Sequence, residues 1–264
     1  FKQKTAYEIA SCLVGSEMCI RDRSMGHLLS LFDHEWLGIQ PNFKIVMLRY
    51  CEFNLVNNGQ ILQTAFYFDI PHLMSQANQN PFDSQTGSSI VQPGPRTHDG
   101  VLFEDANPEE SKATLQLINM MISHLGQWEN PLPLEEELAL SWQDDMLWWG
   151  PHGIGSTYTI ERYAKQHAGP FRAAFSDRSG TGHIARLAEG HYGGFFGSPN
   201  FTARHDGGFM GLPKSDGKIE FKVIDIYRRG EGKLAENWIF IDILSILYQH
   251  GIDVLGRNQS KVGG

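Results

Sequence analysis

The stretch GKLAENWIFIDILSILYQHG, residues 232–251, decides the fold, because another part of the chain repeats it. GQILQTAFYFDIPHLMSQAN, residues 59–78, aligns with it without a gap, and Asp69 meets Asp242. Copies of one supersecondary unit that lie so far apart predict two similar domains and exclude a solenoid of short repeats.

Each copy has the pattern of a strand, a glycine turn, a returning strand and a short helix. In the second copy, IEFKVIDIYRR (219–229) is rich in β-branched and aromatic residues, and a turn at Glu231–Lys233 follows. LAENWIFID (234–242) predicts the returning strand, and ILSILYQ (243–249) has helical spacing. Gly251 then predicts the end of the helix.

Side chains alternate between the two faces of the returning strand. One face carries Glu236, Trp238, Phe240 and Asp242, and the other carries Ala235, Asn237, Ile239 and Ile241. A carboxyl that shares a face with large aromatic side chains is expected to be desolvated.

The residues before the second copy supply a whole domain. We expect a helix at 108–125, a strand at 144–151, a mostly helical segment at 157–175 and a strand with a glycine bend at 182–197. The expected division of the chain is residues 24–80 as the C-terminal half of a first domain, 81–105 as a linker, 106–256 as a complete second domain and 257–264 as a tail.

Residues 1–23 resemble the conceptual translation of a sequencing-library adaptor, so we expect them to be an artefact and exclude them from the fold. An adaptor joined at a random break would leave the natural N-terminus and part of the first domain missing. Without these residues only Cys51 remains of the 3 cysteines, which favours a reducing compartment and a cytoplasmic protein.

Charge and hydropathy exclude two classes of partner. The net charge of −8 leaves no basic patch to neutralise phosphates, so we expect no nucleic-acid partner. The most apolar run, WIFIDILSILY (238–248), is interrupted by Asp242, so we expect no membrane partner either.

Helices followed by an antiparallel sheet that ends in G-K-…-E-x-W-…-D-…-L-…-Q-x-G resemble the SnoaL-like polyketide cyclase family of the nuclear-transport-factor-2-like (NTF2-like) superfamily. The resemblance covers residues 106–256 as a complete domain and 27–80 as a partial one. It implies an α+β fold of the NTF2-like, or cystatin-like, cone type, duplicated and with an incomplete first copy. In this cone a curved antiparallel sheet wraps around helices and encloses an apolar pocket.

Cyclases of this family close a ring by intramolecular aldol condensation without a cofactor, and an aspartate moves the proton. The resemblance carries that role over to Asp242 and, through the repeat, to Asp69, so we expect cofactor-free acid/base catalysis of the cyclase, isomerase or hydratase type. Burial beside Trp238 and Phe240 would raise the pKa of the Asp242 carboxyl and strengthen it as a base. The alternative is that each aspartate caps the helix that follows it.

Further candidates lie in the segment 182–197. Glu189 and His191 alternate onto one face, with His183 in phase, and could serve as a second acid/base or orient a carbonyl. A hydrogen-bonded pair inside the sheet is the alternative. The expected ligand-binding residues, which would suit a small hydrophobic or aromatic molecule, are Trp238, Phe240, Tyr192, Trp149, Tyr158 and His183.

Three alternatives stay open at this point. The cone could be a non-catalytic binding or dimerisation module, because a fold does not determine a function, and family members pair variously, so a homodimer stays open. Epoxide hydrolysis would need an Asp–Arg–Asp set, for which Asp225, Arg228 and Asp242 are candidates. We expect no metal, since no zinc motif occurs, and no cofactor.

Overall fold

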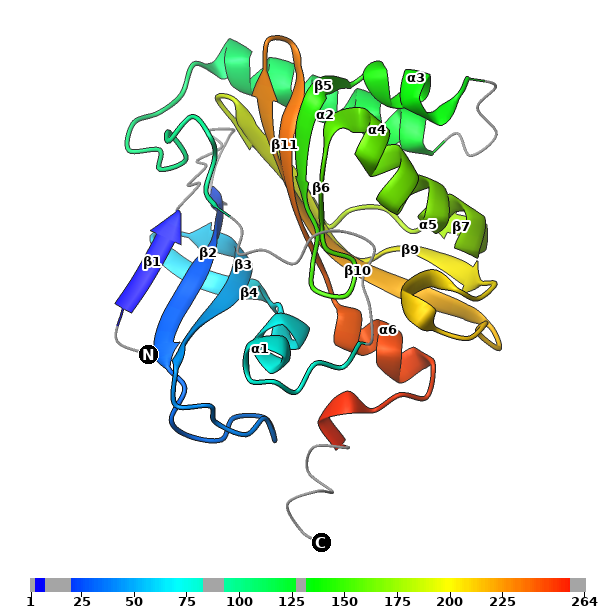
Figure 1. The fold of residues 1–264 in the computed structure, drawn as a ribbon. Helices are drawn as coiled ribbons and strands as arrows, with labels where there is room; N and C mark the ends of the chain where they lie inside the picture. The colour runs from blue at the N-terminus through cyan, green and yellow to red at the C-terminus, as the bar shows by residue number, and fades with distance from the viewer. Residues whose placement is uncertain (1–2, 8–19, 83–92, 127–131, 257–264) are drawn as a thin grey trace, which may run out of the picture.

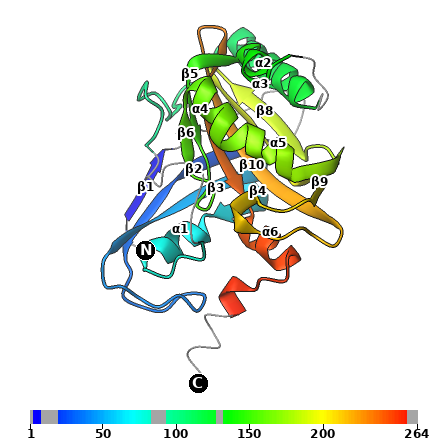
Figure 2. The same ribbon diagram turned by 45° about the vertical axis from the view of Figure 1, so that its right-hand side comes forward.

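The computed structural model describes residues 3–7, 20–82, 93–126 and 132–256. These residues form a strongly curved large sheet with helices on its concave side and a smaller sheet against its other side (Figures 1 and 2). The α+β class and the curved sheet wrapped on helices are as predicted. None of the helices in these ranges is long and apolar enough to cross a membrane.

The large sheet has seven strands. Its order is β6-β5-β11-β10-β9-β7, with β8 also paired to β9, and all pairs are antiparallel except β5 with β11. The bounds are β5 Trp142–Trp149, β6 Ser156–Tyr158, β7 Phe175–Gly180, β8 Ala185–Glu189, β9 Tyr192–His205, β10 Lys218–Gly230 and β11 Lys233–Ile241.

Helices line the concave side of this sheet (Figure 2). They are α2 Pro108–Leu125, α3 Leu134–Ala139, α4 Thr159–Tyr163, the π-helical turn Ala164–Ala168 and α5 Gly169–Ala174. Helix α2 occupies the predicted residues, because the Asn107 side chain accepts a hydrogen bond from the Glu109 N–H and Pro108 fits the first helical position. The segment 157–175 is helical as predicted, but strands occupy both of its ends.

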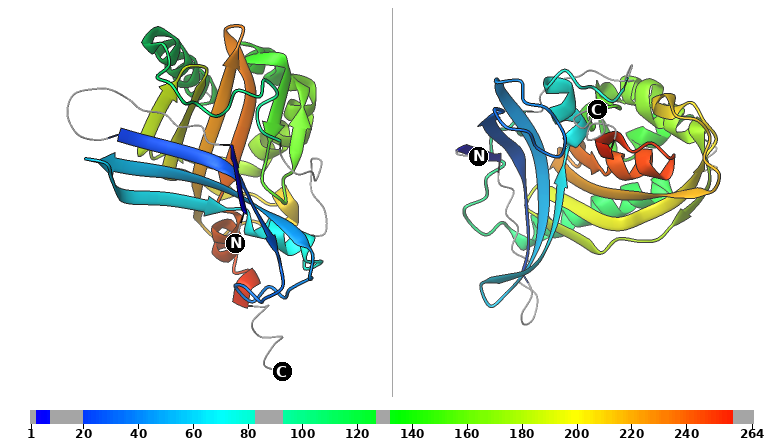
Figure 3. Two further views of the ribbon diagram at one scale, coloured as in Figure 1. Left: turned by 90° about the vertical axis from the view of Figure 1, so that its left-hand side faces the viewer. Right: turned by 90° about the horizontal axis from the view of Figure 1, so that it is seen from below.

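The smaller sheet has the order β1-β2-β3-β4, with β1 Gln3–Tyr7, β2 Ile20–Leu31, β3 Ile45–Asn57 and β4 Gln60–Phe68, and is followed by helix α1 Ile70–Gln76. It packs against the large sheet from the side opposite the helices (Figure 3). A buried cluster joins the sheets and includes Cys51, Phe53, Ile224, Trp238 and Phe240. Both faces of the large sheet are therefore buried.

The two parts share an order of elements. Strands β3 and β4 form an antiparallel hairpin before α1, and β10 and β11 form one before α6 Ile243–Gln249. Asp69 and Asp242 are the N-caps of the two helices. Duplication of one ancestral unit, the domain boundaries and the adaptor origin of residues 1–23 stay predictions.

The residues predicted as a linker are in part packed against the large sheet. The Trp238 indole donates a hydrogen bond to the Pro93 carbonyl at 3.2 Å, and the Arg96 backbone N–H donates one to Glu236 at 3.1 Å. Tyr192 donates a hydrogen bond to Asp99 at 2.5 Å. This segment thus covers the outer face of β11; residues 83–92 lie outside the described ranges.

Candidate functional site

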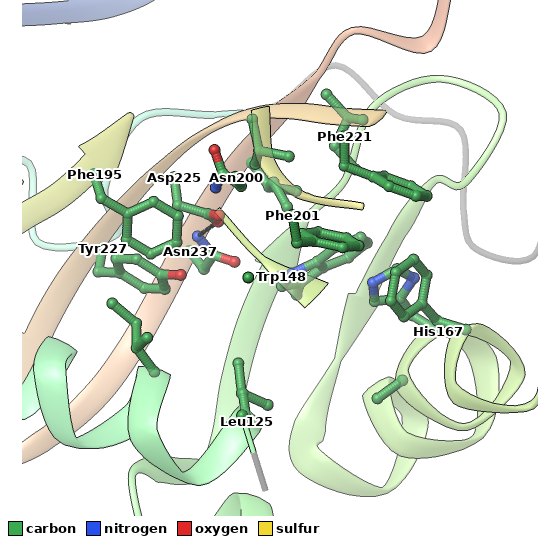
Figure 4. Close-up of a pocket in the computed structure, with 18 of the residues that line it drawn as sticks. Leu125, Trp148, His167, Phe195, Asn200, Phe201, Phe221, Asp225, Tyr227 and Asn237 are labelled. Atoms are coloured by element: carbon green, nitrogen blue, oxygen red, sulfur yellow. Dashed lines mark hydrogen bonds between the residues drawn. The ribbon is translucent and has the colours of Figure 1, made fainter. Parts of the chain in front are cut away.

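A cavity of about 450 Å³ lies between the concave face of the large sheet and the helices (Figure 4). This volume falls in the range of small-molecule sites, roughly 300–1,000 Å³. Its walls are mostly apolar and aromatic, and the principal wall residues are Trp148, Phe171, Phe195, Phe201, Phe221 and Tyr227.

Aromatic rings form the walls of the cavity at close spacing. Trp148 stacks on His167 with ring centroids 4.1 Å apart, and Phe201 stacks on Phe221 at 4.4 Å. Such faces favour a flat hydrophobic or aromatic ligand, because stacking adds to the gain from burying apolar area.

Among the described residues that line this cavity, Asp225 is the one carboxylate. It lies in β10 on the same face as Val223 and Tyr227, and its 5% exposure leaves it almost fully buried. The Asn237 amide on β11 donates a hydrogen bond to Asp225 Oδ1 at 2.9 Å (Figure 4). The Tyr227 side chain also hydrogen bonds to the carboxyl.

Burial raises the pKa of Asp225 from 3.8 to about 7, although the hydrogen bonds from Asn237 and Tyr227 act in the opposite direction. Burial also raises the pKa of Tyr227 well above 10, so its hydroxyl keeps its proton near neutral pH. A carboxyl with a pKa near 7 can accept and return a proton at neutral pH, which is what a general acid/base requires.

Two histidines line the same cavity and are neutral at pH 7. Burial lowers the pKa of His167 to about 3. Burial, followed by the nearby Arg186 charge, lowers the pKa of His183 to about 4. His183 stacks on Phe195 with centroids 4.0 Å apart and accepts a hydrogen bond from Arg186 at 2.7 Å. His183 is therefore a predicted ligand-binding residue that does line the cavity.

Asp242 does not line this cavity. Its Oδ1 accepts a hydrogen bond from the Ser245 N–H at 3.0 Å, which is the N-cap contact of α6. The residue borders a separate hollow between β4 and α6, together with Tyr67 and Ser198. Asp242 continues the face of β11 that carries Trp238 and Phe240, and this face points away from the helices.

Five of the predicted ligand-binding residues also lie outside this cavity. Trp238, Phe240, Tyr192, Trp149 and Tyr158 belong to the cluster between the two sheets and not to the cavity lining. The alternation along β11 was predicted correctly, but the face that carries these aromatic side chains is covered by the smaller sheet and by the segment that contains Pro93 and Asp99.

Glu189 and His191 lie at a hairpin turn, and neither lines the cavity. The segment 182–197 forms β8 and β9 joined at Gly190, whose φ of +55° permits the tight turn. His191 therefore lies in the turn, with its side chain 53% exposed and its Nδ1 3.7 Å from Glu110. Glu189 is buried and accepts a hydrogen bond from the Ala106 N–H at 3.4 Å.

Asp69 occupies a structural position between the two parts of the chain. Its carboxylate accepts hydrogen bonds from the His72 N–H at 3.2 Å and the His152 N–H at 2.9 Å. Arg49 lies 3.6 Å from it and donates hydrogen bonds to the carbonyls of Trp149 and Ile239. Asp69 thus caps α1 and stabilises the contact of β3 with the large sheet.

The Asp–Arg–Asp set considered for epoxide hydrolysis is not assembled. Arg228 pairs with Glu236 on the outer face of the sheet, while Asp225 faces the cavity. The described residues also contain no group of three His, Cys, Asp or Glu side chains that could hold a metal ion.

A signal for a buried Asp225 is present in the sequence, although this residue was predicted only as a member of the epoxide hydrolysis set. In KVIDIYRR (222–229) a single aspartate stands between isoleucines in a strand. An acidic residue there must be desolvated whichever face is interior, because both neighbours are strongly apolar. Asn237, almost opposite on β11, completes the pattern of a buried carboxyl with an amide partner.

One family model matches part of the chain. Residues 164–250 match the family model described as SnoaL-like polyketide cyclase. The match confirms the resemblance read from the sequence over that segment, which contains His167, Asn200, Asp225 and Asn237 from the cavity. A search of curated proteins finds no match.

Several solved structures are similar to about half of the chain. An NTF2-like protein from Burkholderia xenovorans LB400 is 13% identical, covering 53% of this chain and 97% of its own, with a TM-score of 0.41. TsrD from Streptomyces laurentii is 20% identical, with 53% and 96% covered and a TM-score of 0.42. A steroid delta-isomerase from Pseudomonas aeruginosa is 14% identical, with 57% and 93% covered and a TM-score of 0.36. Likeness at this level says nothing about the function of the chain.

Proposed function

We propose that the cavity binds a small hydrophobic or aromatic carbonyl compound and that Asp225 transfers a proton beside the carbonyl, without a cofactor. The single observation behind the proposal is a carboxyl with a pKa of about 7 in an aromatic cavity. The SnoaL-like family match supports a cyclase-type or isomerase-type reaction.

In the proposed step, ionised Asp225 removes the proton from the carbon next to a carbonyl. The C–H bond breaks, an O–H bond forms on the carboxyl, and the electron pair becomes an enolate. The enolate carbon then either bonds to a second carbonyl carbon of the same molecule, whose oxygen takes the proton back from Asp225, or takes that proton at another carbon. Either branch regenerates the Asp225 carboxylate. Asn237 and Tyr227 hold the carboxyl in position through their hydrogen bonds.

Exchange of the C1 protons of 2-tetralone in D2O tests this proposal, because exchange needs only enolisation and no further substrate. We expect the wild-type protein to accelerate the exchange and Asp225→Asn to lower the rate by about 1,000-fold, which is within the range for loss of a general base. Asp242→Asn is the matched control, because asparagine also caps helices, and it should keep the wild-type rate.

The alternative function is a non-catalytic binding module that uses the same aromatic cavity. It predicts that the wild-type protein binds 2-tetralone but gives no exchange above the buffer rate. That result, or full exchange by Asp225→Asn, would contradict acid/base catalysis by Asp225.

A further inference from the structure

Asn200 is a buried polar residue of the cavity that the proposed proton transfer does not use. It lies in β9, is 8% exposed and lines the cavity. Its Oδ1 has no hydrogen-bond partner among the described residues. Burial of an amide oxygen without a hydrogen-bond donor costs free energy, so the position of this oxygen must have a local cause.

The orientation of the Asn200 amide follows from its neighbour Gly197. A Cβ atom built on Gly197 would lie only 1.9 Å from Asn200 Oδ1, so the amide oxygen packs against this glycine. Because the oxygen end is turned to Gly197, the amide nitrogen is the end left for the cavity. Asn200 therefore presents hydrogen-bond donors to a ligand.

The register of the sheet places this donor near Asp225. Gly197 pairs with Val223, which precedes Asp225 by two residues on the same face of β10. Figure 4 shows Asn200 and Asp225 on the same wall of the cavity. A ligand that places an acidic C–H bond next to Asp225 would therefore place its carbonyl oxygen along the same wall, near Asn200.

We propose that Asn200 donates a hydrogen bond to the substrate oxygen that becomes negatively charged when Asp225 removes the proton. The proposal rests on the proposed function of Asp225. It adds to that base the group that stabilises the enolate oxygen. A donor aimed at developing charge in a desolvated cavity stabilises the transition state more than the ground state. The substrate class is accordingly a ketone or related carbonyl compound whose enolate oxygen lies beside β9.

Asn200→Leu tests the assignment, since leucine has a similar size and no donor. With 2-tetralone we expect kcat for exchange to fall about 100-fold, in line with loss of one oxyanion donor. The pH midpoint of the exchange rate should stay at its wild-type value, because the hydrogen bonds that hold the Asp225 carboxyl come from Asn237 and Tyr227. A purely structural role would instead shift the midpoint or lower thermal stability.

Binding of 2-naphthol, which resembles the enol of 2-tetralone, gives a second readout. We expect Asn200→Leu to weaken binding about 10-fold, as for loss of a hydrogen bond to an oxygen that carries partial charge. If Asn200→Leu does not fold, Gly197→Ala replaces it in both assays. Its new Cβ must displace the Asn200 amide, so the exchange rate and the 2-naphthol affinity should again fall.

The outcomes separate the two proposals. Wild-type exchange and 2-naphthol affinity in Asn200→Leu, with an inactive Asp225→Asn, would overturn the role of Asn200 and leave that of Asp225. Absence of 2-naphthol binding by the wild-type protein would also overturn the role of Asn200. Full exchange by Asp225→Asn would instead overturn the proposed function.

Discussion

Asp225 lies in β10 and Asp242 directly follows β11 of the same hairpin, but their surroundings differ. Asp225 faces the aromatic cavity, is almost fully buried and has a pKa raised to about 7 by that burial. Asp242 is half-buried and accepts a hydrogen bond from the first turn of α6. The difference shows that the face of the sheet on which a carboxyl lies determines whether it can act on a ligand. Proximity to an aromatic residue matters less.

The largest effect should appear in the stability of Asp225→Asn at high pH. The folded-state pKa of Asp225 is raised above its unfolded value, so ionisation opposes folding, and this cost is complete above pH 7 and absent below pH 4. A shift from 3.8 to about 7 corresponds to about 4 kcal/mol. The free energy of unfolding of Asp225→Asn should therefore exceed that of the wild type by up to about 4 kcal/mol at pH 8.

Urea unfolding at pH 8 and pH 4 measures this prediction. The two proteins should differ little at pH 4, where both side chains are neutral. If the wild type and Asp225→Asn had equal free energies of unfolding at both pH 8 and pH 4, Asp225 would be a solvated carboxyl and not a buried one.

The next effect compares the two capping aspartates. Asp69→Asn and Asp242→Asn both keep a capping side chain, but only Asp69 lies beside the buried Arg49. Loss of one charge from a buried pair costs about 3 kcal/mol or more, whereas Asp242→Asn should cost less than about 0.5 kcal/mol. Denaturant unfolding of the two variants checks the difference, and equal losses would contradict the role given to Arg49.

A smaller effect concerns the hydrogen bond from Asn237. This bond lowers the pKa of Asp225, so its removal in Asn237→Leu should raise the pH midpoint of 2-tetralone exchange by about one unit. The pH–rate profile measures the shift. A midpoint that stays in place or moves to lower pH would show that the rate does not report Asp225.

The smallest effect should come from removing the cap on α6. Asp242→Ala loses the hydrogen bond to the Ser245 N–H and should lower the free energy of unfolding by about 1 kcal/mol. The exchange rate below the unfolding temperature should not change. A large loss of exchange with intact stability would return the catalytic role to Asp242.

The sequence predicted the elements well where local signals are strong. Helix α2 begins at Pro108 after an Asn cap, and the hairpin of β10 and β11 turns at Gly232, whose φ is +79°. The turn at Gly190 was harder to predict, because a glycine in a strand pattern also fits a bend. The result was a single strand in place of β8 and β9.

The site could be predicted only in part, for a physical reason. Alternation along β11 separated Asn237 from Trp238 correctly, but it does not show which face encloses a ligand. In a sheet with one face exposed to solvent, the polar side chains would mark the exposed face and the apolar ones the interior face. Here the smaller sheet and the segment that contains Pro93 bury the outer face as well, so Trp238 and Phe240 occupy a second core.

The most direct test of the central claim is the titration of the Asp225 carboxyl, followed by carboxyl carbon NMR between pH 4 and pH 9. We predict one aspartate resonance with a midpoint of about 7 that is absent in Asp225→Asn and unchanged in Asp242→Asn. A midpoint near 4 for Asp225, or loss of the high-midpoint resonance in Asp242→Asn, would contradict the catalytic role of Asp225.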